Sequence, residues 1–391
     1  MRNSLKRKGE RLNKETRIEK IKMANKYNSK IQFLLVEPIA KTPYPPLGLM
    51  KISSMLKRHY RGCTVFTKVG NDTPIGLGIP KTVYITSLFT WDIEKVVDSI
   101  HYYQRRFPKA KIHVGGIAAS LCPDFIYKKT GIKPHVGILK TAELFSPDYS
   151  ATFNRKIRSS ISFTSRGCIR NCKFCNVKTL EPQFFVKHNW EKDISSDLPA
   201  ITFWDNNWLA SPNFESDCNK LKKIGKKVDF NQGLDARLFD EEKAKMLSYL
   251  NIDPIRFAFD NISYEKSVLR AIRLAKKYSK NEIRVYVLYN FNDTPEDFFY
   301  RADLLNKEGV LAFPMEYRKA SAGKIKFPGK YWNTHLLRGL KLSLLFYYRR
   351  GMITESRKSF TSFYGKTPKQ FIDKLYEVYW YDKNIRKQSI N

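Results

Sequence analysis

The chain has 391 residues, 42% of them hydrophobic and 14% aromatic, a composition that excludes a wholly disordered chain and suits two or three packed domains. No apolar run approaches the ~20 residues that a membrane-spanning helix needs, and the charged N-terminus lacks the apolar core of a signal peptide. Six cysteines in this length do not make a disulfide framework, so we expect a cytoplasmic protein with no membrane association.

The net charge of +34 is concentrated at the two ends of the chain. Residues 1–30 hold 11 Lys/Arg and 3 Asp/Glu, a net +8, and residues 318–391 hold 17 and 4, a net +13. Residues 1–30 therefore read as a basic N-terminal arm. The charge favours a polyanionic partner such as a nucleic acid, and a lysine-rich solvated surface is the alternative.

Residues 31–150 alternate between short apolar runs and amphipathic stretches. The expected strands and helices, in chain order, are strand 31–36, helix 47–59, strand 83–88, helix 92–106 and strand 111–114. This alternation predicts a Rossmann-like, mostly parallel α/β domain. Residues 133–150 hold Pro and Gly and few periodic positions, so we expect them to connect to the next domain.

Residues 151–317 repeat the alternation about six times. The expected strands are 159–164, 200–204, 227–231, 255–259, 282–288 and 310–315, with helices that include 241–250, 264–278 and 295–309. This pattern predicts a partial (β/α)6 TIM-type barrel, in which chemistry occurs at the carboxyl ends of the strands. Polar residues gather at these ends; ordinary loop polarity and helix capping are the alternative explanation. The candidates are Asp205, Asn206, Gln232, Asp235, Arg237, Asp260 and Asn290.

A cysteine motif follows the first of these strands directly. Cys168, Cys172 and Cys175 form a C-x3-C-x2-C pattern, so three thiols within eight residues can converge on one metal centre. Cys thiolates are the usual ligands of iron–sulfur clusters, and a four-iron cluster with three protein ligands leaves one iron open. A structural zinc site is the alternative, but zinc prefers four protein ligands and only three are grouped here.

This spacing, with the aromatic Phe174 just before the last Cys, resembles the signature of the radical SAM superfamily. The resemblance implies a 4Fe-4S cluster whose open iron is chelated by the amino and carboxylate groups of S-adenosylmethionine. It further implies that the reduced cluster cleaves this cofactor to a 5′-deoxyadenosyl radical, which takes a hydrogen atom from the substrate. A reductase or flavodoxin-type protein would donate the electron. The resemblance covers most of residues 31–317, including the partial six-stranded barrel.

Roles for the strand-end residues follow from the resemblance. It places Asp205 where the family often binds the methionine amino group, and the neighbouring Asn206 and Asn207 could share that task. It also implies that Arg237 pairs with the methionine carboxylate, a task that suits the guanidinium fork. The remaining candidates, which would face the cofactor or the substrate, are Gln232, Asp235, Asp260 and Asn290.

A second resemblance concerns residues 31–150. Pro45-Pro46-Leu47-Gly48-Leu49, the strand end Thr86-Ser87 and His113-Val114-Gly115-Gly116 are similar to the N-terminal cobalamin-binding-type domain of many radical SAM proteins. The cobalt-ligating D-x-H-x-x-G motif of that domain is absent. We therefore expect a degenerate domain that serves as a substrate platform, and bound cobalamin is the alternative.

Residues 318–391 lose the strand pattern and form a basic helical region. Helices are expected over 332–350 and 368–379, with Tyr and Trp interleaved among Lys and Arg. Such mixing suits base stacking with phosphate contact, although a helical cap on the barrel is the favoured interpretation. The whole chain is thus interpreted as a radical SAM enzyme that modifies a tRNA or DNA base. The alternatives are a radical SAM enzyme acting on a small molecule or peptide, and a non-catalytic nucleic-acid-binding protein with a structural metal.

Overall fold

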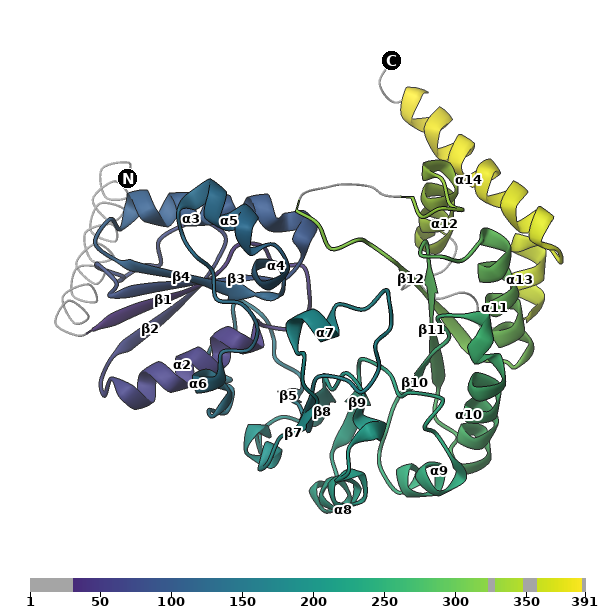
Figure 1. The fold of residues 1–391 in the computed structure, drawn as a ribbon, viewed down its shortest axis with the longest axis horizontal. Coiled ribbons are helices and arrows are strands. Elements are labelled where there is room, and N and C mark those ends of the chain that lie inside the picture. Colours follow the sequence, from purple (N-terminus) through teal and green to yellow (C-terminus); the bar gives the residue numbers. More distant parts are fainter. Residues whose placement is uncertain (1–30, 323–327, 347–356, 389–391) are drawn as a thin grey trace, which may run out of the picture. The chain divides into compact units, whose positions relative to one another are not determined.

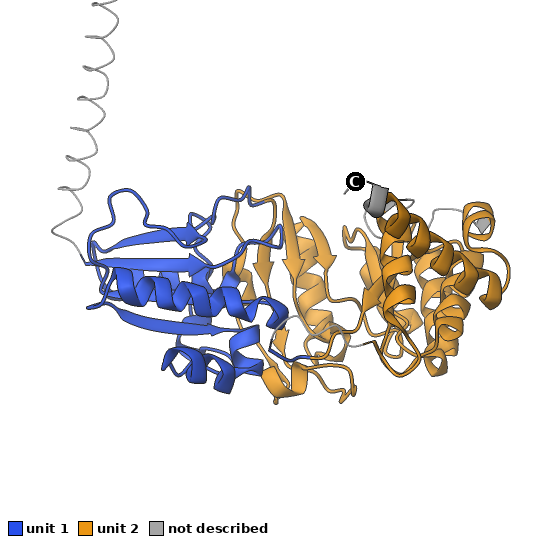
Figure 2. Cartoon of the chain, turned by 90° about the horizontal axis from the view of Figure 1, so that it is seen from above, with its two compact units in different colours: residues 1–157, 320–325 blue, residues 158–319, 326–391 orange. Residues whose placement is uncertain are grey.

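The computed structural model describes residues 31–322, 328–346 and 357–388, so the basic arm expected at residues 1–30 lies outside the described part. The chain divides into two compact units (Figure 2): unit 1 is Met1–Ile157 with Ala320–Ile325, and unit 2 is Arg158–Lys319 with Lys326–Asn391. The expected domain limits at residues 150 and 317 stay predictions. Within the described ranges, no helix combines the length and the apolar character required to cross a membrane.

Unit 1 is built on a four-stranded parallel sheet with the order β2-β1-β3-β4 (Figure 1). The strands are β1 (Gln32–Glu37), β2 (Thr64–Val69), β3 (Thr82–Ser87) and β4 (Lys111–Gly116). Their alternation with helices confirms a parallel α/β architecture. The sequence did not indicate β2, because this edge strand is half-buried along its length and its Thr and Lys residues interrupt any apolar run.

The helices of unit 1 are α2 (Leu47–His59), α3 (Ile93–Arg106) and the short α4 (Ile117–Leu121), α5 (Pro123–Thr130) and α6 (Lys140–Glu143). The first two lie where the sequence predicted them. The apolar face of α3 packs into the core of the unit, with Ile93 and Ile100 fully buried. The segment 133–150, expected as a connection, contains α6 and Asp148, whose carboxylate accepts hydrogen bonds from Ser53 and Lys57 of α2.

Unit 2 contains six parallel strands whose spatial order follows the sequence (Figure 1). They form two sheets: β5 (Ser160–Ser162), β8 (Ala200–Phe203) and β9 (Lys227–Phe230), then β10 (Ile255–Ala258), β11 (Ile283–Tyr289) and β12 (Leu311–Glu316). Parallel bridges at Val228–Ile252 and Leu234–Phe257 link β9 to the β10 region. The strands match the predicted positions, and their closure into a partial barrel stays a prediction.

Helices follow the strands of unit 2: α7 (Val177–Leu180), α8 (Phe214–Ile224), α9 (Glu241–Ser248), α10 (Glu265–Tyr278) and α11 (Pro295–Lys307). A capping box between Thr294 and Asp297 starts α11 and satisfies backbone donors of its first turn. The core is rich in aromatic rings; Phe230 stacks between Phe203 at 5.5 Å and Trp208 at 4.0 Å. This packing fixes the ends of β8 and β9, from which the candidate site is built.

Three C-terminal helices complete unit 2: α12 (Thr334–Phe346), α13 (Arg357–Tyr364) and α14 (Pro368–Gln388). They bury an apolar face against α11, where Phe299 lies 5.3 Å from Phe371. At Gly339 of α12 a Cβ would lie 2.1 Å from the backbone oxygen of Leu375, so glycine permits the close crossing with α14. Both predicted helices exist, and residues 347–350 of the first lie outside the described part.

Candidate metal centre

The cysteine loop begins at a tight backbone approach. Two short strands, β6 (Ser165–Arg166) and β7 (Phe185–Val186), pair antiparallel. Their pairing brings the start of the loop beside Gln183. Gly167 has a φ of +75°, and a Cβ there would lie 2.1 Å from the backbone oxygen of Gln183. Only glycine fits this position. Glu181 fixes the turn by accepting the Gly167 N–H at 2.6 Å and pairing with Arg166 at 2.9 Å.

The three thiols of the loop lie within electrostatic range of one another. All are free, and the charges of Cys168 and Cys172 both act on Cys175. The Cys168 Sγ accepts from the backbone N–H of Arg170 at 3.3 Å and from Nδ2 of Asn207 at 3.7 Å. Burial raises the pKa of the Cys172 thiol, and the nearby guanidinium of Arg237 opposes that rise.

These donors suit sulfur that carries negative charge, as a metal-bound thiolate does. Over the described residues, however, no three His, Cys, Asp or Glu side chains are grouped closely enough to hold a metal ion. The donor set of the loop therefore fits a three-thiolate centre by its chemistry, and the ligand geometry stays undefined.

Asp205, which follows β8, holds the start of this loop through hydrogen bonds to Thr164 and Ser165. Its buried carboxylate accepts the backbone N–H groups of Thr164 at 3.0 Å and Ser165 at 2.6 Å, and both of their hydroxyls at 2.7 Å. Burial raises the pKa of Asp205, and these four donors oppose the rise. The structure thus gives Asp205 a positioning task, and its contact with a methionine amino group stays a prediction.

The two asparagines after Asp205 face different partners. Asn206 donates its amide to Glu181 at 3.0 Å, so it braces the same turn. Asn207 is 3% exposed and donates Nδ2 to both Cys168 and Asp235. Its Oδ1 is buried, and no hydrogen-bond donor reaches it within the described part of the chain. A buried acceptor beside the loop is therefore open to a ligand that carries N–H groups.

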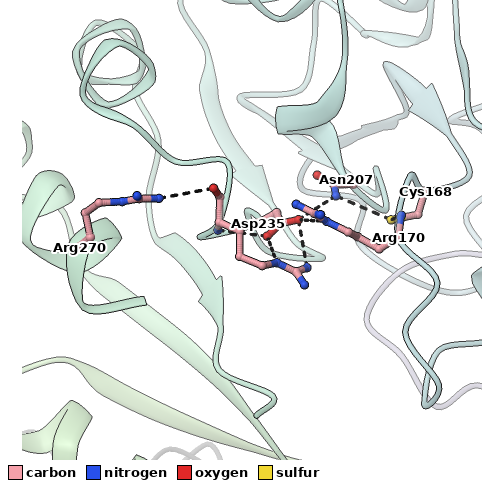
Figure 3. A network of polar contacts seen from close by, with 6 residues as sticks. Cys168, Arg170, Asn207, Asp235 and Arg270 are labelled. Atoms are coloured by element: carbon pink, nitrogen blue, oxygen red, sulfur yellow. Dashed lines mark hydrogen bonds and ion pairs between the residues drawn. The ribbon is translucent and has the colours of Figure 1, made fainter. Parts of the chain in front are cut away.

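Asp235, after β9, is the centre of a polar network around the loop (Figure 3). It accepts from Arg170 Nε at 3.0 Å and from Arg237 Nε at 2.7 Å, in addition to Asn207 at 3.1 Å. Burial alone would raise the pKa of Asp235, but the two guanidinium groups outweigh it, and the net pKa lies below the ordinary value. Arg270 extends the network by donating to the backbone oxygen of Arg237 at 3.4 Å.

Two further strand ends approach the loop. Asp260, after β10, lies within electrostatic range of Cys172 and Cys175, and burial raises its pKa to about 6, against the opposing charges of Arg301 and Arg237. The ring of Phe174, inside the cysteine motif, lies 5.9 Å from the ring of Phe291, which follows β11. The loop is thus contacted from the ends of β8, β9 and β11, and the charge of Asp260 after β10 acts on it.

The last two predicted site residues lie apart from this network. Asn290 is 1% exposed, donates to the Tyr317 backbone oxygen at 3.1 Å and accepts the backbone N–H of Gly329 at 2.5 Å. It braces the ends of β11 and β12, and its role toward a ribose or substrate stays a prediction. Gln232 is exposed after β9, and its predicted role also stays a prediction.

Sequence reasoning missed two residues that organise the site, Arg170 and Glu181. Arg170 lies inside the cysteine motif, and a charged residue there was the available signal for a loop-to-strand contact. Asn207 was expected, with Asn206, to share the task of Asp205, and only its buried, half-satisfied amide distinguishes it from Asn206. Glu181 follows the motif as an isolated acid, and nothing in the local sequence marks it as the partner of Gly167.

In unit 1, the glycine pair after β4 is explained by strand packing. Gly116 pairs in register with Ser87 and has a φ of +102°; a Cβ would lie 2.3 Å from the Ser87 backbone oxygen. The Ser87 hydroxyl donates to the backbone oxygen of Gly115 and accepts the N–H of Ala119. The Thr86-Ser87 strand end and the glycine pair therefore join β3, β4 and α4. His113 stacks on Tyr84 at 5.3 Å within the sheet.

No protein-family model matches the chain, and no curated protein matches it. A solved structure that is similar to it is described as the apo, selenomethionine-labelled, cobalamin-dependent S-adenosylmethionine radical enzyme OxsB. The identity is 13% and the TM-score 0.45, and the match covers 85% of this chain and 57% of that chain. This chain therefore spans little more than half the length of that enzyme, and a match this loose carries no functional argument.

Proposed function

We propose that this chain is a radical SAM enzyme that modifies a nucleic acid. The observation that carries the proposal is the cysteine loop: a segment with three free thiols that contacts the carboxyl ends of three parallel strands. The contacts that support this placement join Cys168 to Asn207, Arg170 to Asp235, and Phe174 to Phe291. Carboxyl ends of parallel strands are where β/α folds gather their chemistry.

Cys168, Cys172 and Cys175 would hold a four-iron cluster, leaving one iron without a protein ligand. When bound, such a cluster supplies one electron to the sulfonium of S-adenosylmethionine and starts radical chemistry. The protein's own task is to hold that cofactor and to position it against the substrate. An electron donor of the reductase or flavodoxin type and a reducing cytoplasm belong to this proposal.

Asn207 is the residue we now favour for the methionine amino group. Its Oδ1 is a buried acceptor with no donor among the described residues, whereas the neighbouring Asp205 carboxylate already accepts four. Arg237 uses Nε and one terminal nitrogen on Asp235. A guanidinium carries five N–H donors, and that of Arg237 also hydrogen-bonds Cys172, so its place beside the thiols supports the proposed contact with the methionine carboxylate. Asp260, whose charge acts on Cys172, is a candidate for hydroxyl groups of the cofactor.

The substrate class rests on charge. The +34 net charge and its concentration toward residues 318–391 support a polyanion, and a tRNA or a DNA strand is the polyanion we propose. We further propose that unit 1 serves as a substrate platform. Its Gly115-Gly116 pair is already used in strand packing, so the motif gives cobalamin no additional support.

The test of the radical chemistry is anaerobic reconstitution with iron and sulfide, followed by reduction and measurement of 5′-deoxyadenosine. We expect about four iron and four sulfide per chain in a 4Fe-4S protein, and cofactor cleavage that Cys168→Ser abolishes. Cys63→Ser is the matched control, because Cys63 is a half-buried free thiol of unit 1. One zinc per chain without acid-labile sulfide would instead support a non-catalytic protein with a structural metal.

The substrate class is tested separately, by measuring tRNA and single-stranded DNA binding at several salt concentrations. A polyanion held by Lys and Arg binds more weakly as salt rises, with a slope that counts the phosphates neutralised. Undetectable or salt-independent binding would remove the nucleic-acid part of the proposal. It would direct the search to a small molecule or a peptide and leave the cofactor chemistry intact.

A further inference from the structure

One face of α14 carries aromatic rings that the helix packing does not bury completely. Tyr376, Tyr379, Trp380 and Lys383 stand at i, i+3, i+4 and i+7, a spacing that puts them on one side of a helix. The core-facing side of α14 is formed by Phe371 and Leu375, both fully buried. Trp380 keeps 45% of its surface exposed.

The rings of this face contact one another and a residue of α12. His335 stacks on Tyr379 at 4.3 Å with an interplanar angle of 29°, and it lies 5.7 Å from Trp380. Tyr379 and Trp380 meet edge to face at 5.0 Å. Asn333 holds the Tyr376 hydroxyl at 2.8 Å, so the rings are fixed from the side of α12. The residues Asn333, His335, Tyr376, Tyr379, Trp380 and Lys383 are called the aromatic face below.

Cationic groups accompany the exposed ring. The Lys383 ammonium lies 4.5 Å from the centre of the Trp380 ring. Residues 318–391 hold 17 Lys/Arg against 4 Asp/Glu, so the surrounding segment is strongly basic. A fixed, partly exposed ring with a lysine ammonium over it matches a nucleotide, whose base stacks on the ring while its phosphate pairs with the ammonium.

We propose that the aromatic face of α12 and α14 binds a single-stranded segment of nucleic acid by stacking a base on Trp380. This inference rests on the nucleic-acid substrate proposed above and adds a second contact surface, formed by residues other than those of the cysteine loop. Double-stranded nucleic acid does not offer an unstacked base to the ring. The proposal therefore commits to single strands.

The test measures binding of the full-length protein to a fluorescently labelled single-stranded RNA of about 20 nucleotides, and to the duplex of the same sequence. Stacking on an aromatic side chain contributes enough that Trp380→Ala is expected to weaken single-strand binding by about fivefold or more. Trp380→Phe keeps a stacking ring and is expected to stay within about twofold. Lys383→Ala is expected to reduce the salt slope by about one phosphate.

The matched control is Tyr249→Ala. Tyr249 is 68% exposed and has the Lys222 ammonium 4.9 Å from its ring, so it repeats the chemistry at an unrelated place in unit 2. We expect it to change neither affinity nor salt slope. Thermal unfolding of each variant verifies that the helices remain folded.

The proposal is overturned if Trp380→Ala binds the single strand as tightly as the unchanged protein, or if Tyr249→Ala weakens binding equally. In both cases nucleic-acid binding persists, so the proposed substrate class survives. If the unchanged protein binds neither strand form, the aromatic face and the nucleic-acid substrate fail together, while 5′-deoxyadenosine formation still decides the enzyme chemistry.

Discussion

Replacing Asp235 by Asn tests whether the polar network holds the cysteine loop on the sheet. The Asp235 side chain is 7% exposed and forms ion pairs with Arg170 of the loop and Arg237. Asn keeps the shape and one acceptor oxygen, but it removes the negative charge and places an N–H₂ group against donors. Arg170 then loses its only ion pair within the described residues, and the loop loses its attachment to the end of β9.

The size of the effect follows from burial. Removing one partner of a fully buried ion pair costs about 3–5 kcal/mol. Arg170 and Arg237 are 32% and 29% exposed, so water screens them partly. We expect the free energy of unfolding at pH 7 to fall by about 2 kcal/mol, between the buried and the exposed limits.

The effect should depend on pH with a defined sign. The net pKa of Asp235 in the folded protein is lowered by its two arginine partners, against burial. Its stabilisation is therefore complete above the unfolded value of about 3.9 and is lost as the pH falls through the folded value. The difference in the free energy of unfolding between the unchanged protein and Asp235→Asn should be constant from pH 7 to pH 5. It should become smaller below about pH 4.

The assay is urea unfolding of the apo-protein between pH 3 and pH 7, together with the iron content after reconstitution. Asp303→Asn is the control, because Asp303 pairs with Lys307 one turn along α11, far from the loop in sequence. The Lys307 side chain is 47% exposed and that of Asp303 16%, and an i,i+4 helix pair at the surface contributes about 0.3–0.5 kcal/mol. The reasoning is refuted if Asp235→Asn and Asp303→Asn lose equal stability, or if Asp235→Asn incorporates iron normally.

Other predictions concern single side chains of unit 2. Gly167→Ala adds a Cβ 2.1 Å from the backbone oxygen of Gln183 at a φ of +75°. Iron incorporation should therefore fall while the far-UV circular dichroism spectrum is unchanged. Normal iron content would contradict the prediction. Arg301→Met removes a fully buried partner of Asp293 and should lower the free energy of unfolding, measured in urea, by about 3–5 kcal/mol. A loss below about 1 kcal/mol would contradict this prediction. Burial raises the pKa of Asp217 to about 6, so the stability it contributes is present below about pH 4 and is lost as the pH rises through 6. Asp217→Asn should therefore be more stable than the unchanged protein by about 2 kcal/mol at pH 7.5 and no more stable at pH 4, and equal stability at pH 7.5 would refute the assignment.

The strand positions were predictable because buried parallel strands appear as short apolar runs. The runs at 31–36 and 282–288 correspond to β1 and β11, which are regular and largely buried. Edge strand β2 was not predictable, since a half-exposed strand with Thr and Lys lacks such a run. The β6–β7 pair was equally hidden, because two-residue strands have no periodicity to detect.

The candidate site was predictable at the level of strand ends and not at the level of individual roles. Asp205 and Asp235 both follow strands, and the sequence alone does not distinguish the hydrogen-bond partners of their carboxylates. In the structure, Asp205 faces backbone N–H groups and Asp235 faces two arginines. The contacts of Asp205 with Ser165 and of Asp235 with Arg170 join residues 40 and 65 positions apart, and periodicity carries no information about such contacts.

The contacts of the cysteine loop attach it to the ends of three strands. Each third of the motif has its own attachment: Cys168 to the end of β8, Arg170 to the end of β9 and Phe174 to the end of β11. A loop fixed at three separate strands has lost most of its conformational freedom before any ligand arrives, so metal binding need not supply that ordering free energy. Asp205 and Asp235 therefore act on the loop, and through it on a cofactor. On this argument, variants of Asp205 and Asp235 should lower the iron content after reconstitution, and so should variants of Asn207, which contacts both Cys168 and Asp235.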